Sequence, residues 1–411
     1  MEYVARIYKN AYSGLSPATW WLSLVMLINR AGTMVVPFLT LYLTQSRHYG
    51  IAKAGLVMAI FGAGAICGGV LGGKLTDKLG FYNVQLSSLV CGGIMFLVVG
   101  QMTEYVPICI ATFILAVLNE SFRPANSTAI AQYSNESNRT RCYSLNRLAI
   151  NLGWAFGGAL GGIIASKNYQ ALFWIDGLTN IGAAILLRAV LAPQRNVQTP
   201  AFNKEQLKTK EKGKSPYKDK YYMIFIVLTI LFAFSFFQLF TTIPVFFREQ
   251  LHFSPKFIGA IMALNGIIIA VFEMALVFKL EARNRNLHIM GWGTFIMALS
   301  FMVFNVMPYG WLVAIISTLL VTLGEMMAMP FMNTFMVNRT DTNNRGQYAG
   351  LLTAGWSIAQ VLGPYCGTHI VEQYGYTVLW WVVGAIGTTA ALGFKWMEGS
   401  IAREEKQSQI V

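Results

Sequence analysis

The chain has 411 residues, of which 55% are hydrophobic and only 12% charged, and its net charge is +13 at pH 7. Polar residues are too few to cover a soluble globular protein of this length, so we expect an all-α integral membrane protein. The basic residues lie in short loops and one linker instead of on an aromatic-rich face, so we expect no nucleic-acid partner.

Apolar stretches of roughly 20 residues, the length that crosses a bilayer as a helix, follow one another along the chain. Twelve are predicted, near 18–44, 51–75, 82–102, 106–132, 142–166, 169–192, 221–249, 254–280, 286–307, 310–337, 346–371 and 374–396. We therefore expect two pseudo-symmetric six-helix bundles, over 1–192 and 221–411, joined by a basic linker over 193–220. The linker is either only a tether or also binds anionic lipid headgroups.

Lysine and arginine are distributed unequally between the two sides of these spans. With both termini placed in the cytoplasm, the short inside loops hold nine basic residues and the outside loops hold five. The linker, which is then also cytoplasmic, adds eight more. The positive-inside rule thus predicts cytoplasmic termini, and we expect the protein in the plasma (inner) membrane, in contact with its lipids.

The first span contains Asn29 and Arg30 roughly midway along its length. An arginine at that depth is unfavourable against lipid, so we expect Arg30 to point into an internal cavity. There it meets either an acidic side chain or an anionic group of a substrate. The sequence does not choose between these two partners.

The loop after the second span reads "GGKLTDKLGFYN". It resembles the motif G-x-x-x-D-[RK]-x-G-[RK]-[RK] of the major facilitator superfamily, although "FYN" stands where the final basic pair belongs. The matching residues are Gly73, Asp77, Lys78 and Gly80. The resemblance implies that Asp77, supported by Lys78, holds the outward-facing state by pairing with a cation or a helix N-terminus across the cytoplasmic seam. The alternative is that Asp77 only caps the third span.

The fourth span contains "LNESFRPANST", in which Glu120 and Arg123 lie three residues apart on one helix face. Pro124 follows them and can loosen the backbone. A carboxylate at this depth is penalised when charged, so Glu120 is our first candidate for protonation from one side and release to the other. The alternative is a permanent ion pair between Glu120 and Arg123.

The two halves of the chain resemble each other. Residues 118–144 line up with residues 323–350, which places Glu120 over Glu325. An internal repeat of about half the chain is typical of a two-lobed transporter whose site lies between the lobes, near the middle of the bilayer. In addition, "GWAFGGALGG" (153–162) resembles the glycine-rich fifth-span motif of the antiporter branch of the superfamily.

Further acidic residues lie within predicted spans, namely Asp176, Glu273 and Glu325. Together with Glu120 they are our candidates for proton coupling. The alternative for Asp176 is a position near the outer membrane interface, and the alternative for Glu273 is a position close to the cytoplasmic end of its span.

Polar and aromatic side chains in several spans form the predicted substrate cavity. They are Asn29, Arg30, Arg123, Arg147, Asn151, Gln238, Asn333, Trp356 and Gln360. Arg147 and Asn151 are four residues apart, so they share one face of the fifth span. The alternative for any one polar group is that it holds two helices together.

Motifs of other protein classes are absent from the sequence. It has no G-x-x-x-x-G-K-[ST], so ATP does not drive transport directly. It has neither G-x-S-x-G nor H-E-x-x-H, and its five cysteines show no CxxC spacing, so we expect no enzyme, no metal site and no disulfide framework. We expect a monomeric secondary active transporter that needs no cofactor and uses a proton gradient.

The resemblance to the antiporter branch implies export of small amphipathic compounds in exchange for protons. A first alternative is proton-coupled uptake of a small polar solute such as a peptide or a sugar. A second alternative, from another class, is a lipid flippase or a non-transporting membrane receptor on the same scaffold.

Overall fold

The computed structural model describes residues 6, 9–49, 51–165, 167–191, 215–283, 285–308, 310–341 and 343–408. Every regular element in these ranges is a helix. Most of the predicted linker 193–220 lies outside the described residues. The two alternative roles of the linker, as a tether or as a binder of lipid headgroups, therefore concern residues that the structure does not describe. The bundle limits at 192 and 221 therefore remain predictions.

The first half of the chain begins with a divided span. Its elements are α2 (Pro17–Ala31), α3 (Val35–Leu41), η1 (Tyr42–Ser46), α4 (Ile51–Leu79), α5 (Phe81–Gln101), α6 (Tyr105–Tyr133), α7 (Arg139–Ala165) and α8 (Tyr169–Val190). The predicted span 18–44 is thus split into α2, α3 and η1. Between α2 and α3, the N–H groups of Met34 and Val35 donate to the carboxylate of Asp176 in α8. This internal acceptor makes the break tolerable at a depth where backbone polar groups need a partner within the protein.

The second half of the chain ends with a doubled span. Its elements are η2 (Pro216–Lys218), α9 (Lys220–Phe237), α10 (Thr242–Glu249), α11 (Pro255–Glu281), α12 (Asn286–Val306), α13 (Trp311–Asn338) and α14 (Arg345–Ser408). α14 turns at Gly375, whose φ of 79° lies in the left-handed region that favours glycine. α14 therefore contains both of the last two predicted spans.

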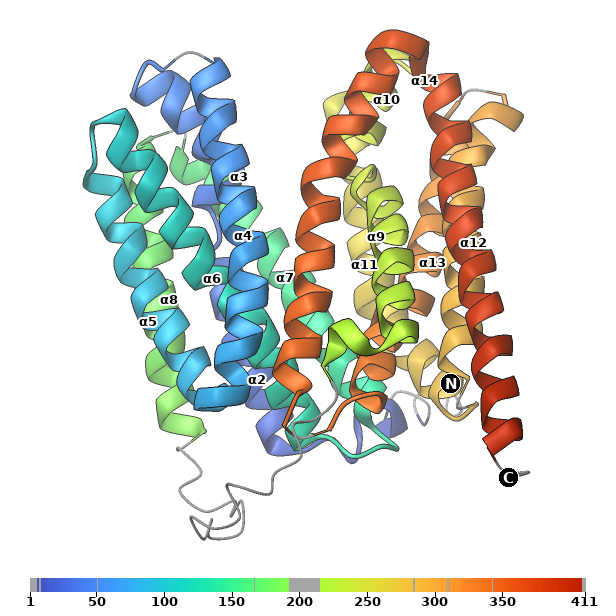
Figure 1. The fold of residues 1–411 in the computed structure, drawn as a ribbon. Coiled ribbons are helices and arrows are strands. Elements are labelled where there is room, and N and C mark those ends of the chain that lie inside the picture. The colour runs from blue at the N-terminus through green and yellow to red at the C-terminus, as the bar shows by residue number, and fades with distance from the viewer. Residues whose placement is uncertain are drawn as a thin grey trace, which may run out of the picture.

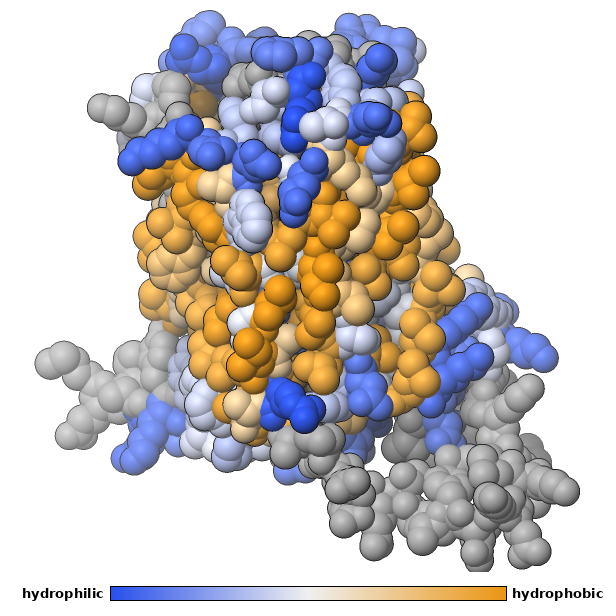
Figure 2. Space-filling view, turned by 90° about the vertical axis from the view of Figure 1, so that its left-hand side faces the viewer, coloured by the Kyte–Doolittle hydropathy of each residue, from blue (hydrophilic) through white to orange (hydrophobic). Residues whose placement is uncertain are grey.

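Within the described residues, ten helices are long and apolar enough to cross a membrane. The divided first span and the doubled α14 account for the difference from the twelve spans predicted. Figure 2 shows that hydrophobic residues form a band between two hydrophilic rims on one face of the molecule, as a lipid-facing surface requires. The predicted all-α membrane fold is confirmed.

The helices form two bundles, α2 to α8 and α9 to α14 (Figure 1). The bundles meet along α4 and α14, and along α7 with α11 and α13. We call the lower end of the molecule in Figure 1, where α2 begins and α14 ends, the terminal face.

The two bundles are packed by different means. In the first bundle, α4 lies so close to α6 that a Cβ added at Gly68 would be 2.5 Å from the carbonyl oxygen of Val117. Such close packing through small residues stabilises membrane helices, because lipid supplies no hydrophobic force between them. The second bundle packs around the rings of Phe246, Phe304 and Trp380, all fully buried and in edge or tilted contact.

Candidate functional site

One arginine of the first bundle binds two carboxylates of the second. Arg147 in α7 donates from Nη2 to Oε2 of Glu325 in α13 at 2.8 Å, and from Nη1 to Oε2 of Glu273 in α11. Both glutamate side chains are 2% exposed, and the Arg147 side chain is 11% exposed. We call these three residues the central cluster. The structure thus brings together three of the residues that the sequence analysis named separately.

Neutral side chains complete the hydrogen bonding of the central cluster. Ser144, one turn before Arg147 on α7, donates from Oγ to Oε1 of Glu273 at 2.6 Å. Asn265 in α11 donates from Nδ2 to Oε1 of Glu325 at 2.5 Å. Each carboxylate therefore has one charged and one neutral donor, as buried polar groups require.

The central cluster carries one net negative charge when both glutamates are ionised, because two carboxylates share one guanidinium. Burying a charge that has no counter-charge, away from water, costs free energy. Binding of one proton, or of one other monovalent cation, balances it. A proton on either glutamate also replaces a charge-assisted hydrogen bond to Arg147 by a weaker neutral one. The cluster can therefore link the occupancy of a proton to the contact between the bundles.

A second charged group lies wholly within the first bundle. In α6, Nη1 of Arg123 and Oε2 of Glu120 are 3.1 Å apart, with side chains 31% and 13% exposed. Arg30 in α2 lies within electrostatic reach of both, and its Nε is buried without a hydrogen-bond partner. We call these three residues the arginine group. In this structure Glu120 is ion-paired within its own helix, and among the described residues it forms no hydrogen bond or ion pair to the other bundle.

Asp176 and Asn29 hold helices together. Asp176 is fully buried and accepts the N–H groups of Met34 and Val35 at 2.7 to 2.9 Å, at the start of α3. Asn29 in α2 donates from Nδ2 to Oδ1 of Asn180 in α8 at 2.8 Å. Both contacts lie within the first bundle, so we leave these residues out of the proposed function.

Gln238 and Trp356 join α9 to α14 within the second bundle. Gln238 is fully buried and donates from Nε2 to the carbonyl oxygen of Gly363 at 2.8 Å. The indole of Trp356 makes edge contacts with the rings of Phe236 and Phe237. These contacts fit the alternative stated for the polar residues of the spans, in which a side chain holds two helices together.

The remaining predicted cavity residues are scattered. Gln360 in α14 is exposed, and Asn333 in α13 is half-buried, with its Nδ2 3.4 Å from the carbonyl oxygen of Met329 in the same helix. Asn151 is half-buried, and its Nδ2 has no hydrogen-bond partner. Within the described residues none of these three side chains is hydrogen-bonded to the central cluster.

Asp77 joins the bundles at the terminal face. Its Oδ1 accepts the N–H of Gly346 at 2.6 Å, and its Oδ2 accepts the N–H of Gln347 at 2.8 Å. These N–H groups belong to the first turn of α14, where a helix has unsatisfied donors and a partial positive charge. Lys78 is exposed, and Gly80, with φ of 84°, is the N-cap residue before α5. We call this contact the Asp77 seam.

Glycines bring the main chains of α4 and α14 together in the Asp77 seam. A Cβ added at Gly73 would lie 2.3 Å from the carbonyl oxygen of Gly346 and 2.9 Å from Cα of Gly350. A Cβ at Gly69 would lie 3.1 Å from the backbone nitrogen of Ala354. No side chain fits between the two helices at Gly73, so there the main chains themselves close this side of the interface.

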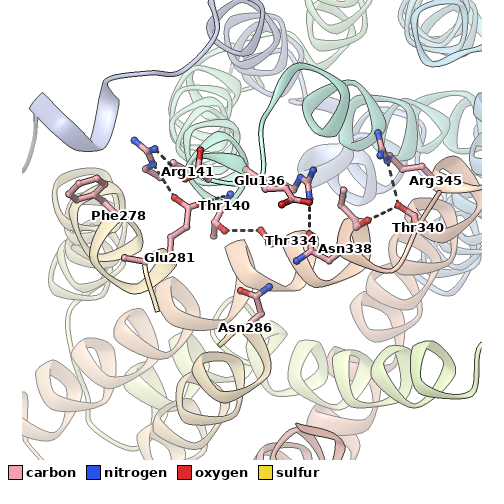
Figure 3. A pocket seen from close by; sticks show the side chains of 14 residues that line it. Glu136, Thr140, Arg141, Phe278, Glu281, Asn286, Thr334, Asn338, Thr340 and Arg345 are labelled. Atoms are coloured by element: carbon pink, nitrogen blue, oxygen red, sulfur yellow. Dashed lines mark hydrogen bonds and ion pairs between the residues drawn. The ribbon is translucent and has the colours of Figure 1, made fainter. Parts of the chain in front are cut away.

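An analogous contact joins α11 to α7. Glu281 accepts the N–H of Thr140 on Oε1 at 2.8 Å and the Nε–H of Arg141 on Oε2 at 3.0 Å (Figure 3). Thr140 lies in the first turn of α7, so Glu281 caps a helix N-terminus of the other bundle. Beside it, Nη1 of Arg139 donates to Oδ1 of Asn338 at 2.6 Å. We call this contact the Glu281 seam.

A hollow of about 880 Å³ opens beside the Glu281 seam. Figure 3 shows that its walls come from both bundles. Its charged lining residues are Glu136, Arg139, Arg141, Glu281 and Arg345. This side of the interface is therefore closed by polar side chains around a cavity.

Glu281 was not among the site residues predicted from the sequence. A signal for it exists, because "KLTDK" at 74–78 has a counterpart in "KLEAR" at 279–283, displaced by 205 residues. The pair Glu120 and Glu325 has the same displacement. With this displacement Asp77 aligns with Ala282, and the acidic residue of the second half, Glu281, lies one position before it.

The cross-bundle hydrogen bonds and ion pairs described above all lie between the terminal face and the central cluster. The structure is therefore in a state that is closed at the terminal face. In the described part of the chain, no three His, Cys, Asp or Glu side chains are grouped so as to hold a metal ion.

Known proteins resemble this chain over most of its length. The Na(+), Li(+), K(+)/H(+) antiporter of Planococcus maritimus is 19% identical over 90% of this chain and 93% of its own. The tetracycline resistance protein, class C, of Escherichia coli is 24% identical over 82% of this chain and 84% of its own. The crystal structure of the human organic anion transporter MFSD10 (TETRAN) superposes with a TM-score of 0.70, at 13% identity, over 92% of this chain and all of its own.

The model of the Major Facilitator Superfamily matches residues 22–353 and 285–409, which together cover most of the chain. The superfamily comprises membrane transporters that are not enzymes and generally need no cofactor. The chain therefore belongs to the major facilitator superfamily and is a secondary transporter of small molecules.

Proposed function

We propose that this transporter exports small amphipathic compounds in exchange for protons, and that the central cluster is its proton-coupling site. One observation carries the proposal: Arg147 of the first bundle binds two buried carboxylates, Glu273 and Glu325, of the second. The site therefore has an excess negative charge and also holds the two bundles together. A proton acts on both properties at once.

The coupling follows from this geometry. A proton on Glu273 or Glu325 removes the unbalanced negative charge of the buried cluster and also weakens one bond to Arg147. Separation of α7 from α11 and α13 changes both terms, so the closed and the separated contact differ in their affinity for a proton. A ligand shifts a conformational equilibrium only by its difference in affinity between the states, and the proton has such a difference here.

Two further observations support the direction of transport and the membrane orientation. The excess of basic residues in the loops of the terminal face supports cytoplasmic termini, and the face that is closed here is then the cytoplasmic one. Two relatives bear names that state proton antiport and tetracycline resistance. Both names support exchange of an exported compound for protons, and we further propose that the protein works as a monomer in the plasma membrane.

The proposal is tested with purified protein in proteoliposomes that enclose a pH-sensitive dye. Under an imposed pH gradient, tetracycline and a panel of amphipathic dyes are each added, and movement of the compound and of protons is recorded. We expect compound-dependent proton movement in opposite directions. Co-directional movement of a peptide or a sugar with protons would instead support uptake.

Variants test whether the central cluster couples transport of the compound to movement of protons. We expect Glu325→Gln and Glu273→Gln each to abolish proton movement while exchange of labelled for unlabelled compound continues, because the amide keeps the shape but not the charge. Glu104→Gln, at an exposed glutamate before α6, is the matched control and should transport normally. Proton coupling that survives in both cluster variants would refute the assignment.

A further inference from the structure

We propose that the arginine group is a carboxylate-binding subsite, so that the preferred substrates are amphipathic compounds that carry a carboxylate. The inference rests on the proposed function, because it names the substrate class of the same transport. It is carried by Arg30, Glu120 and Arg123, none of which contacts the central cluster within the described residues.

Arg30 lacks a partner for its guanidinium. The Nε–H is buried and has no hydrogen-bond acceptor. No ion pair to Arg30 occurs among the described residues, although Glu120 is near enough to act on it electrostatically. An arginine that is not paired is unusual inside a membrane-spanning helix, because burying a charge without a partner is costly. Arg30 is thus left with donors for a ligand.

The charges of the arginine group do not balance. Its two guanidinium groups face one carboxylate, and Glu120 is already bound to Arg123 at 3.1 Å. One further negative charge would make the group neutral. A carboxylate fits this need best among small acceptors, because the planar fork of an arginine binds its two oxygens in parallel.

The position of the arginine group suits a substrate site. Arg30 is thirteen residues beyond Pro17 at the terminal face, which places it about 20 Å into the molecule at 1.5 Å per residue. The Arg123 side chain is 31% exposed at a similar depth in α6. A guanidinium exposed at that depth faces a wetted space and not lipid. The substrate therefore approaches it from the interior of the transporter.

The backbone around Arg30 is held in place. A Cβ added at Gly153 in α7 would lie 2.5 Å from Cβ of Arg30, and one at Gly157 would lie 3.2 Å from its carbonyl oxygen. α2 and α7 are therefore in close contact at this point. A guanidinium on a fixed backbone loses less entropy when it binds a ligand, which favours its use as a recognition group.

The test compares matched pairs of amphipathic carboxylic acids and their methyl esters, beginning with a quinolone acid and its ester. Binding to the purified full chain in detergent is measured through its intrinsic tryptophan fluorescence. We expect the acids to bind about tenfold tighter than the esters, or more, because a charge-assisted bidentate bond is lost in the ester. In Arg30→Gln we expect the acids to weaken to the level of the esters, and in Arg30→Lys a partial preference to remain.

Controls separate charge recognition from folding and from proton coupling. Arg188→Gln removes one positive charge at an exposed position in the last turn of α8 and should keep the full preference for acids. The melting temperature shows that each variant is folded. Glu325→Gln should lose proton coupling yet still prefer acids, so the two proposals can fail separately. Equal binding of acids and esters across the panel, no binding of either, or a preference that persists in Arg30→Gln would overturn the inference.

Discussion

The two seams at the terminal face are built around the same kind of hydrogen-bonded contact but differ in the residues that surround it. In each, a carboxylate near the end of one helix accepts N–H groups from the first turn of a helix in the other bundle. Asp77 of α4 binds α14, and Glu281 of α11 binds α7. The exchange of roles between the bundles is what the internal repeat predicts, because each half supplies one carboxylate and one helix N-terminus.

The surroundings of the two carboxylates differ. Around Asp77 the main chains touch, and glycine is the residue that allows it at Gly73, Gly346 and Gly350. Around Glu281 the contact runs through Arg141 and other side chains, beside a hollow of about 880 Å³. We infer that the Asp77 seam tolerates no added atom, whereas the Glu281 seam is sensitive to charge and hydrogen bonding and not to volume.

The largest effect is expected when an atom is added to the Asp77 seam. In Gly73→Ala the new Cβ would lie 2.3 Å from a main-chain oxygen, so α4 and α14 must separate. Overpacking of this kind costs about 1–3 kcal/mol, which lowers the ratio of closed to open molecules by about 5-fold to 150-fold. The measurement is the distance distribution between spin labels at the exposed residues Lys74 and Arg283, on opposite bundles.

Gly55→Ala in the same helix is the control for Gly73→Ala. A Cβ at Gly55 would meet no atom within 4 Å, so the added methyl group should leave the distances unchanged. An unchanged closed population in Gly73→Ala would show that the main-chain contact is not what closes this side.

A somewhat smaller effect is expected when each capping charge is neutralised. Asp77→Asn and Glu281→Gln each replace a charged acceptor by a neutral one, which reduces a hydrogen bond from about 1.5–3 kcal/mol to about 0.5–1.5 kcal/mol, so each should lower the ratio of closed to open molecules about tenfold. The double variant measures their coupling. We expect the two effects to add, since the carboxylates share no partner. A double variant no worse than either single one would mean that the two seams act as one unit.

The sequence alone was sufficient for the fold but not for the site. Span length and composition predicted the helices, and the motif around Asp77 singled out the first seam. The sequence named Arg147, Glu273 and Glu325 as separate candidates, but their meeting depends on how α7, α11 and α13 pack, which no local pattern encodes. The sequence favours Glu120 for proton coupling because its carboxylate lies deep in a span, whereas the ion pair with Arg123 in the structure is the alternative that the spacing of three residues left open.

A weaker contact of the Glu281 seam should have a smaller effect. Thr334 in α13 donates from Oγ1 to Oγ1 of Thr140 in α7 at 3.0 Å. Thr334→Val keeps the shape and removes this neutral hydrogen bond, worth about 0.5–1.5 kcal/mol, together with the longer contact of 3.3 Å from the same Oγ1 to the carbonyl oxygen of Pro330 within α13. We expect the closed population to fall only severalfold in the spin-label measurement. An effect as large as that of Gly73→Ala would contradict the idea that the main-chain contact of the Asp77 seam contributes more to closure than a single neutral hydrogen bond of the Glu281 seam.

The smallest effect on the seams is expected from a capping carboxylate that does not cross between bundles. Asp219 caps α9 through the N–H of Tyr222 and accepts two hydrogen bonds, at 2.8 and 3.0 Å, from Arg339 of the same bundle. Because this contact has the same chemistry but lies within one bundle, Asp219→Asn should leave the spin-label distances unchanged. It should nevertheless lower the melting temperature of the protein.

The pH dependence of that melting temperature has a definite sign. Burial raises the pKa of Asp219, but the hydrogen bonds and charge of Arg339 and the N–H of Tyr222 outweigh it and leave the pKa below its ordinary value of 3.8. A carboxyl whose pKa is lower in the folded state stabilises the fold above that ordinary value, and this contribution declines as the pH falls through the folded value. The difference in melting temperature between the unmodified protein and Asp219→Asn should therefore be constant near neutral pH and shrink below about pH 4. A difference that grew on acidification would mean that burial, and not Arg339, controls this carboxylate.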